Sequence, residues 1–165
     1  MTDIVDALTR SRMMAGIRSQ DTKPERLVRG SLHRAGFRFS LRNTELPGRP
    51  DLVLTRHRAV VFVHGCFWHC HACKYFKLPS TRQDFWADKL AGNVSRDRRV
   101  CHELRDANWR IAVVWECATR SPAFNTERLV SVFSEWLLGS DAEYVELRGT
   151  QANGISARRS TARSL

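Results

Sequence analysis

The stretch VVFVHGCFWHCHAC at residues 60–73 joins an apolar strand to a loop that is dense in metal ligands. After His64, five cysteine and histidine side chains fall within eight positions: Cys66, His69, Cys70, His71 and Cys73. Thiolate and imidazole ligands together suit zinc better than calcium or magnesium. Neighbouring buried cysteines alone would not explain the interleaved histidines. The sequence therefore predicts a zinc-binding loop directly after a strand.

A second apolar segment, residues 109–115, offers a ligand from outside this loop. Cys117 follows that segment just as Cys66 follows the first one. If the two segments are adjacent strands, their ends meet and Cys117 can complete a closed, structural site with no position open for a substrate. The four ligands of that Cys3His site would be Cys66, His71, Cys73 and Cys117. The residues alone leave open whether His69 or Cys70 replaces one of them.

The length and composition indicate one soluble domain. The 165 residues suffice for a single core, and hydrophobic residues make up 42% of the chain. No apolar run approaches the ~20 residues of a membrane-spanning helix, and residues 1–10 lack the layout of a secretory signal. We therefore expect a cytoplasmic protein with no membrane partner. In that compartment clustered cysteines bind metals more often than they form disulfides, and the odd number of cysteines, five, agrees.

The charge balance points to an acidic partner. The chain has 27 Lys and Arg residues against 17 Asp and Glu residues, a net charge of +10. Residues 148–165 contain four of the arginines and no acid, so the rest keeps 23 basic against 17 acidic residues, or +6. A domain with this excess of positive charge is suited to bind the phosphate backbone of nucleic acid. The alternative from charge alone is a solvated basic face without a partner.

The order of the predicted elements indicates an α/β (α+β) fold, with a mixed central sheet flanked by helices. Strands are expected over residues 37–41, 50–55, 59–64, 109–115 and 140–147, and helices over 3–19, 22–35, 81–104 and 124–138. Thr22 with Glu25, and Thr81 with Asp84, have the spacing of capping boxes. The expected organisation is a basic helical arm over residues 1–20, one domain over 21–147, and a disordered basic tail over 148–165.

Two carboxylates stand out from their surroundings. Asp97 lies on a helical stripe that is otherwise apolar, so it needs either a structural ion-pair partner or a catalytic role. Asp51 follows Pro50 at the start of a strand, as in nucleases that bind magnesium through an aspartate. The second half of that nuclease pattern is missing, because residues 63–65 occupy its place. On local sequence alone, a turn residue is the better interpretation of Asp51, and a helix cap the better interpretation of Glu25.

A series of motifs connects these residues. HGCFWH at residues 64–69 and LPGRPD at residues 46–51 are the longest, and shorter ones stand at 21–22, 85–86, 93–94, 96–99 and 114–117. In this order, over residues 9–138, the motifs resemble those of the very-short-patch repair (Vsr) DNA mismatch endonucleases. The resemblance implies a restriction-endonuclease-like fold with a structural zinc loop. It also implies a magnesium-dependent nick 5′ to the thymine of a T·G mismatch, the product of 5-methylcytosine deamination.

The resemblance implies partners as well. Double-stranded DNA with a T·G mismatch would be the substrate, a cytosine-5 DNA methyltransferase system would act alongside, and mismatch-repair proteins would be further partners. Cutting one strand requires only a monomer, which we expect to act on DNA in the bacterial cytoplasm.

The matching motifs also imply roles for individual residues. Asp51 and the backbone carbonyl of Val63 would bind magnesium. His69, oriented by Asp97, would be the general base. The residues expected to contact metal-bound water or phosphate are Glu25 and His64. Val63 departs from the threonine of the best-known pattern, which leaves activity intact if only its carbonyl is used.

An aromatic wedge is implied for the DNA interface. Phe67, Trp68 and Trp86 would open the duplex beside the mismatch. The other DNA-binding residues implied are Met14, Lys89 and Asn93. The zinc ligands implied are the four cysteine and histidine residues named above, and Cys70 stands where the family can have another histidine.

Two other functions are compatible with the residues themselves. A zinc-stabilised DNA-binding module without catalysis would keep the zinc ligands and the basic surface but would not need Asp51, His69 or Asp97. A hydrolase with a catalytic zinc would instead use His69 as a ligand. Nicking assays with and without magnesium separate these functions from a magnesium endonuclease.

Overall fold

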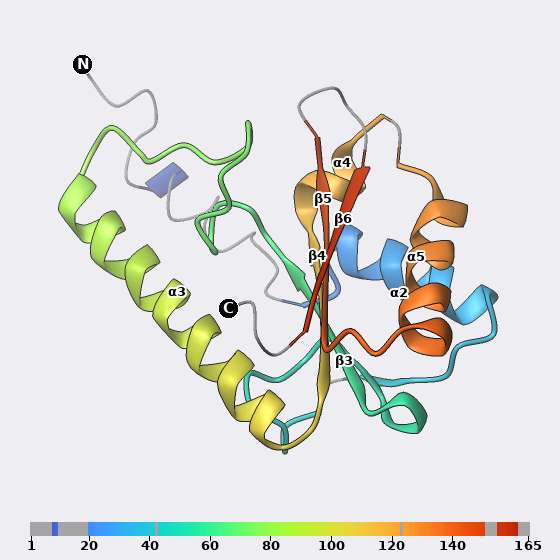
Figure 1. Cartoon of the computed structure of the whole chain (residues 1–165). Helices are drawn as coiled ribbons and strands as arrows, with labels where there is room; N and C mark the ends of the chain where they lie inside the picture. The colour runs from blue at the N-terminus through green and yellow to red at the C-terminus, as the bar shows by residue number, and fades with distance from the viewer. Residues whose placement is uncertain (1–7, 10–19, 42, 123, 151–154, 162–165) are drawn as a thin grey trace.

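A computed structural model describes residues 8–9, 20–41, 43–122, 124–150 and 155–161 (Figure 1). In this part of the chain, helices and strands are arranged around a single sheet. Met14 and most of the helix predicted over residues 3–19 lie outside the described residues.

The described strands form one mixed sheet in the order β1-β2-β3-β4-β5-β6. Its strands are β1 (Ser40–Leu41), β2 (Leu52–Leu54), β3 (Ala59–His64), β4 (Arg110–Trp115), β5 (Tyr144–Gly149) and β6 (Ile155–Ser160). The pairs β3–β4 and β4–β5 are parallel, and the other neighbouring pairs are antiparallel. The mixed central sheet predicted from the sequence is confirmed.

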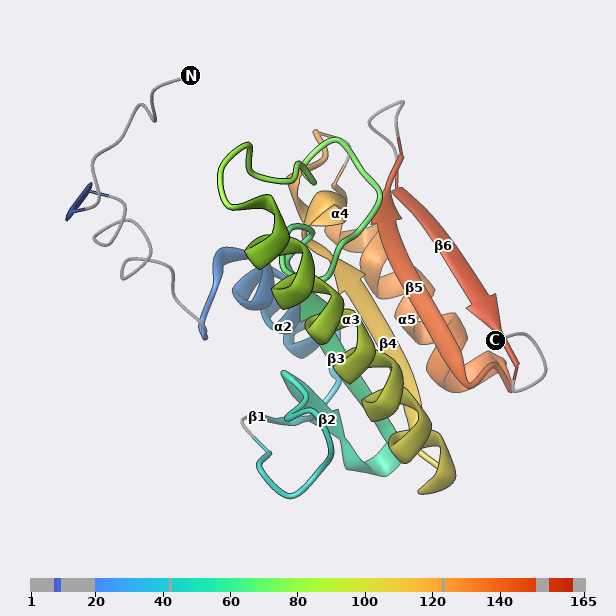
Figure 2. The same ribbon diagram turned by 90° about the vertical axis from the view of Figure 1, so that its left-hand side faces the viewer.

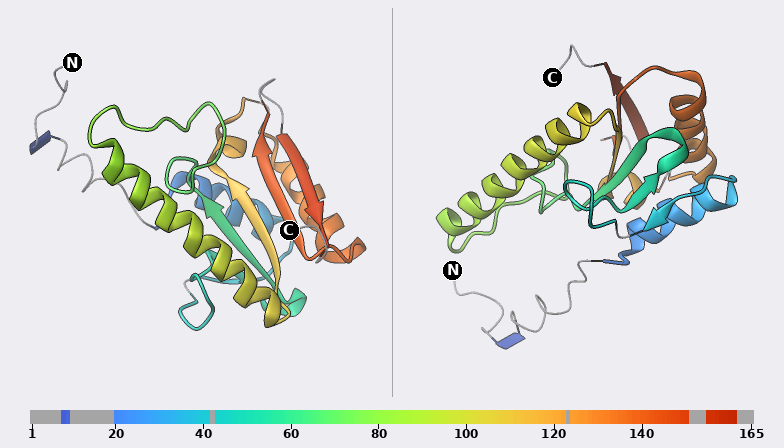
Figure 3. Two further views of the ribbon diagram at one scale, coloured as in Figure 1. Left: turned by 60° about the vertical axis from the view of Figure 1, so that its left-hand side comes forward. Right: turned by 90° about the horizontal axis from the view of Figure 1, so that it is seen from below.

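Helices cover both faces of this sheet (Figures 2 and 3). On one face, α2 (Lys23–Arg34) and α5 (Thr126–Gly139) bury residues such as Leu32 and Phe133 against the strands. On the other face, α3 (Gln83–Asp106) packs Val100 and Leu104 against residues of β3 and β4. Two short helices, η1 (Thr55–His57) and α4 (Glu116–Arg120), complete the described elements.

The pairing of β3 with β4 determines where the predicted metal ligands lie. Both strands are rich in buried β-branched residues, which suits a central position covered on both faces. Their parallel register pairs His64 with Trp115, so both strands end at the same edge of the sheet. The zinc loop leaves this edge from β3, and α4 begins there at the end of β4. The expectation that Cys66 and Cys117 meet at adjacent strand ends is therefore correct.

Helix capping agrees with the sequence at one of the two predicted sites. At the start of α2, the Thr22 hydroxyl oxygen accepts a hydrogen bond from the Glu25 N–H at 3.4 Å. In return, the Glu25 carboxylate accepts hydrogen bonds from the Asp21 N–H at 2.8 Å and the Thr22 hydroxyl at 2.9 Å. The capping box predicted for Thr81 is wrong, because α3 begins after Arg82, whose backbone is left-handed with φ 52° and which makes no capping hydrogen bond.

The prediction of a disordered tail over residues 148–165 is also wrong for the part that forms β6. This strand pairs antiparallel with β5 along its whole length. Ala157 packs against the core, and the Arg159 guanidinium contacts the Glu135 carboxylate of α5 at 2.6 Å. Two of the arginines that suggested disorder, Arg158 and Arg159, belong to this edge strand, where charged side chains discourage pairing with other chains.

Candidate active site and metal centre

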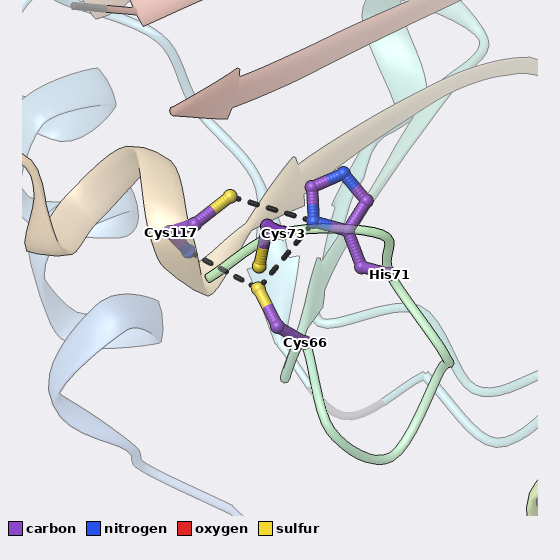
Figure 4. A group of neighbouring side chains, drawn as sticks. All are labelled: Cys66, His71, Cys73 and Cys117. Carbon is purple, nitrogen blue, oxygen red and sulfur yellow. Dashed lines mark hydrogen bonds between the residues drawn. The ribbon is translucent and has the colours of Figure 1, made fainter. Parts of the chain in front are cut away.

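Four side chains at the shared edge of β3 and β4 point toward a common centre (Figure 4). They are Cys66, His71, Cys73 and Cys117, and one ligand atom of each lies within 4.8 Å of the others. The Nδ1 atom of His71 is 3.6 Å from the Cys66 sulfur and 3.5 Å from the Cys117 sulfur. A tetrahedral zinc, with Zn–S about 2.3 Å and Zn–N about 2.0 Å, separates such ligand pairs by about 3.5 Å. The four residues therefore fit a closed zinc site.

The sulfur atoms of this group are held by backbone donors. The Cys117 N–H donates to the Cys66 sulfur at 3.3 Å, and the Gly149 N–H donates to the Cys117 sulfur at 3.2 Å. A side chain at Gly149 is excluded, because a Cβ there would lie 2.6 Å from the Cys117 carbonyl oxygen. Hydrogen bonding with Cys66 lowers the pKa of the Cys117 thiol, and the hydrogen bond from the Gly149 N–H acts in the same direction. These hydrogen bonds favour the thiolate form of Cys117, which is the form that binds a metal.

Two side chains left open by the sequence lie outside this group. Among the described residues, neither His69 nor Cys70 belongs to the four-ligand cluster. Cys70 has a left-handed backbone conformation, with φ 52°, and directly precedes the ligand His71 in the loop. His69 belongs to a second cluster, formed with His64 and Asp97.

The second cluster contains a histidine–carboxylate pair. The Nδ1 atom of His69 lies 2.5 Å from Oδ2 of Asp97, which projects from α3. This contact is the partner that the sequence required for Asp97 on its apolar stripe. Because the carboxylate accepts a hydrogen bond from the Nδ1–H, the Nε2 atom of His69 is left as the basic nitrogen. The pair has the geometry of an oriented general base.

His64 packs flat on His69. The two imidazole rings are stacked, with centroids 3.8 Å apart and planes only 1° apart. Burial, together with the nearby charge of His69, lowers the pKa of His64 to about 3. His64 is therefore neutral at physiological pH and does not compete with His69 for a proton.

Asp51 lies beside these histidines in a cavity of about 240 Å³. Val63, His64, His69 and Glu25 line the same cavity. One Asp51 oxygen, Oδ2, accepts a hydrogen bond from the Val63 N–H at 2.6 Å. The pKa of Asp51 is raised to about 6, because burial and the nearby Glu25 carboxylate outweigh the opposing hydrogen bond from the Val63 N–H. Glu25 thus caps α2 and faces the cavity at the same time.

An aromatic cluster adjoins this site. The rings of Phe67, Trp68 and Trp86 lie 5.1–6.1 Å apart, and the ammonium of Lys89 lies over both tryptophans at 5.5 Å. The Asn93 side-chain amide donates to the Trp68 carbonyl at 3.0 Å, which ties the loop to α3. The cluster therefore unites five of the six residues expected to bind DNA.

Three residues near these sites had no role predicted from the sequence. Phe85 joins the aromatic cluster and is 45% exposed. The Glu116 carboxylate accepts from the Cys66 N–H at 3.4 Å and so steadies the start of the zinc loop. Trp115 contacts both histidine groups. The position of Trp115 at the end of a predicted strand, two residues before Cys117, was the sequence feature that could have indicated such a contact.

Comparison with known proteins gives the family. A sequence profile described as "DNA mismatch endonuclease Vsr" matches residues 2–75. The protein of that name from Escherichia coli K12 is 43% identical over 143 residues, which cover 86% of this chain and 92% of that protein. The chain belongs to the Vsr family of DNA mismatch endonucleases.

Other relatives are named as nicking enzymes. Type II nicking enzyme V.XorIIP of Xanthomonas oryzae is 46% identical over 117 residues, covering 71% of this chain and 86% of that enzyme. Type II nicking enzyme V.NmeAIP of Neisseria meningitidis is 42% identical over 129 residues, covering 78% and 92%. The predictions of family, of a restriction-endonuclease-like fold and of endonuclease activity are confirmed. Membership of this nuclease family implies a divalent metal. No described helix is long and apolar enough to cross a membrane.

Proposed function

We propose that this Vsr-family endonuclease nicks one strand of duplex DNA 5′ to the thymine of a T·G mismatch and so initiates very-short-patch repair. The observation that carries the proposal is the His69–Asp97 pair, which lies in one cavity with the Asp51 carboxylate. The names of the relatives, a mismatch endonuclease and nicking enzymes, support the same reaction. The histidine–carboxylate pair favours a catalytic protein over a DNA-binding module.

Asp51 and the backbone carbonyl of Val63 would hold magnesium. The donor set fits this ion, since it consists of oxygen atoms and leaves room for the several waters that magnesium retains. Oδ2 of Asp51 is fixed by the Val63 N–H, so the second carboxylate oxygen is available to a metal. When bound, magnesium would supply positive charge that stabilises the phosphorane-like transition state. Glu25 and His64 would bind metal-ligated water or the phosphate from the cavity walls.

His69 would act as the general base. Its Nε2 atom takes the proton of the attacking water, and Asp97 stabilises the resulting imidazolium through the Nδ1 hydrogen bond. Neutral His64, stacked on its face, adds no positive charge that would weaken the base. Zinc at Cys66, His71, Cys73 and Cys117 would be structural, because all four of its positions are filled by the protein.

The aromatic cluster would select the mismatch by deforming the duplex. Inserting Phe67, Trp68 and Trp86 between base pairs costs a few kcal/mol per step and least at a mismatched pair. Stacking of bases on these rings returns about 1–3 kcal/mol per base. Lys89, placed over the rings, and Asn93, bonded to the loop, would approach the DNA from α3. Met14 would add a contact from residues 1–20.

The proposed cellular setting follows from the substrate. T·G mismatches from deaminated 5-methylcytosine require a cytosine-5 methyltransferase in the same bacterial cytoplasm, and their repair would involve mismatch-repair proteins. The net charge of +10 supports binding to DNA. A single-strand nick needs one active site, so a monomer would suffice.

A nicking assay on labelled duplexes tests the proposed function. We expect one nick 5′ to the thymine in a T·G duplex, and none in the matched T·A and C·G duplexes. The nick should disappear when magnesium is omitted from protein that retains its zinc. Equal cleavage of matched and mismatched duplexes would contradict the proposal, and cleavage without magnesium would favour a catalytic zinc.

His69→Ala should lower kcat for this nick by about 10²–10⁴-fold, the usual contribution of a general base. Asp97→Asn should lower kcat as well, because a neutral amide stabilises the imidazolium less. His33→Ala, at an exposed position on α2, is the matched control and should nick normally. Single-turnover rates on the T·G duplex measure all three, and a fully active His69→Ala variant would eliminate His69 as the base.

A further inference from the structure

Trp115, the last residue of β4, lies between the zinc ligands and the histidine–carboxylate pair. On the zinc side, its indole ring stacks on the imidazole of His71, with centroids 4.1 Å apart and planes 9° apart. This is a flat contact with a side chain that would be fixed by the metal. The position of the indole is therefore tied to that of the zinc loop.

On the catalytic side, Trp115 meets the stacked histidines at a steep angle. Its ring centroid is 5.3 Å from that of His64 and 6.3 Å from that of His69, and both interplanar angles are 70°. The β3–β4 register places His64 directly beside Trp115, so the contact is set by the backbone pairing of two central strands. Edge-to-face contacts of this kind favour one relative orientation of the rings.

A carboxylate from a third strand anchors the indole. The Trp115 Nε1–H donates to Oε1 of Glu146 at 2.5 Å, and Glu146 belongs to β5. The ring is thus held by three different segments: the zinc loop, β3 and β5. An indole fixed in this way limits the movement of the two histidine rings that contact it.

Asp97 alone does not orient His69 completely. A single hydrogen bond to Nδ1 sets the direction of that nitrogen, but it restrains tilting of the imidazole plane only weakly. The flat stack on His64 fixes that plane, and His64 in turn rests against Trp115. Small errors in the placement of a reacting group can cost up to about 10²-fold in rate.

We propose that Trp115 is a positioning residue, which transmits the rigidity of the zinc loop to His64 and His69 and so aims Nε2 of His69 at the scissile phosphate. The proposal rests on the proposed function for the identity of the reaction. Under this proposal the structural zinc has a second role, because the metal would orient the general base as well as order the loop.

Trp115→Leu and Trp115→Phe test the proposal, with Trp109→Leu as the matched control. Trp109 packs in the same apolar cluster at the opposite end of β4, away from the histidines. For Trp115→Leu we expect kcat on the T·G duplex to fall on the order of 10- to 100-fold with KM nearly unchanged. Trp115→Phe keeps a ring against His64 but loses the hydrogen bond to Glu146, so its kcat should fall only several-fold, between the values of wild type and Trp115→Leu. Trp109→Leu should keep the wild-type rate.

A second readout does not depend on substrate. The Nδ1 proton of His69, held between nitrogen and the Asp97 carboxylate, should give a low-field proton resonance, identified by its loss in His69→Ala. We expect this resonance to broaden or shift most in Trp115→Leu, less in Trp115→Phe, and not at all in Trp109→Leu, while all three variants retain one zinc per chain. An unchanged kcat and resonance in Trp115→Leu would overturn the proposal. A Trp115→Leu variant that has lost its zinc, and that nicks at the wild-type rate once zinc is restored, would overturn it as well.

Glu146→Ala covers the case in which Trp115→Leu does not fold. This variant keeps the indole but removes the acceptor that anchors it, so kcat should fall several-fold and the His69 resonance should broaden. Wild-type behaviour of Glu146→Ala would then overturn the proposal. Failure of the proposed function is distinguishable, because it would appear as wild-type protein that does not nick the T·G duplex.

Discussion

Asp51→Asn should abolish nicking and at the same time stabilise the metal-free protein at pH 7. Activity is lost because a neutral amide is a poor magnesium ligand. Stability rises because burial has raised the pKa of Asp51 from 3.8 to about 6, so the ionised carboxylate is disfavoured in the folded state. That difference corresponds to at most about 3 kcal/mol in the free energy of unfolding. Asparagine removes the charge and keeps an oxygen for the Val63 N–H.

The pH dependence gives the sign of this effect. Between pH 3.8 and about 6 the folded wild-type protein binds more protons at Asp51 than the unfolded chain does. The contribution of Asp51 to wild-type stability therefore falls as pH rises through this window and stays low above it. The advantage of Asp51→Asn should be full above pH 6 and vanish near pH 4.

Urea unfolding of the metal-free proteins at several pH values measures this difference. Asp106→Asn is the control, since Asp106 is an exposed residue at the end of α3 and its replacement should change stability by less than about 0.5 kcal/mol. Magnesium should stabilise the wild-type protein but not Asp51→Asn. An Asp51→Asn variant that still nicks DNA, or that is less stable than wild type at pH 7, would refute the role assigned to this carboxylate.

Cys117→Ala should lose the zinc and become strongly destabilised. Cys117 is the one ligand from outside the loop, so without it the metal no longer joins β3 to the end of β4. Structural zinc sites contribute on the order of 10 kcal/mol to folding in zinc-finger peptides. For one deleted ligand in a protein with its own core, we expect a loss of about 4 kcal/mol or more in the free energy of unfolding.

Metal analysis and denaturant unfolding provide the measurement. Cys70→Ala and Cys101→Ala are matched controls, because both cysteines lie outside the four-ligand group of the described residues. Each should retain one zinc per chain and nearly wild-type stability. Full zinc occupancy in Cys117→Ala, or its loss in Cys70→Ala, would show that the ligand set is different.

Sequence patterns predicted the features that depend on local chemistry. The apolar runs of β3 and β4 were long enough to be recognised, and a ligand after each run implied that the two ends meet. Asp97 was identified as a carboxylate in need of a partner because its stripe is otherwise apolar. Its partner His69 lies 28 residues away, and only tertiary packing brings them together.

The features that were missed depend on contacts that local patterns do not contain. β6 looked disordered because its arginines and serines resemble a solvated tail, whereas its ordering comes from β5 and from Glu135 on α5. The five residues of α4 are too few to show a helical period. Trp115 appeared to be one more apolar strand residue, and its contact with His71 depends on the path of the zinc loop.

The zinc ligands also imply an order of events when the chain folds. Cys66, His71 and Cys73 lie within one loop, so they can gather a metal ion as soon as that loop has been synthesised. Cys117 is 51 residues beyond Cys66 and can join only after α3 and β4 have emerged. Parallel strand pairs form slowly because their contacts are distant in sequence. A metal ion already held at the end of β3 would capture Cys117 and shorten the search of β4 for its neighbour.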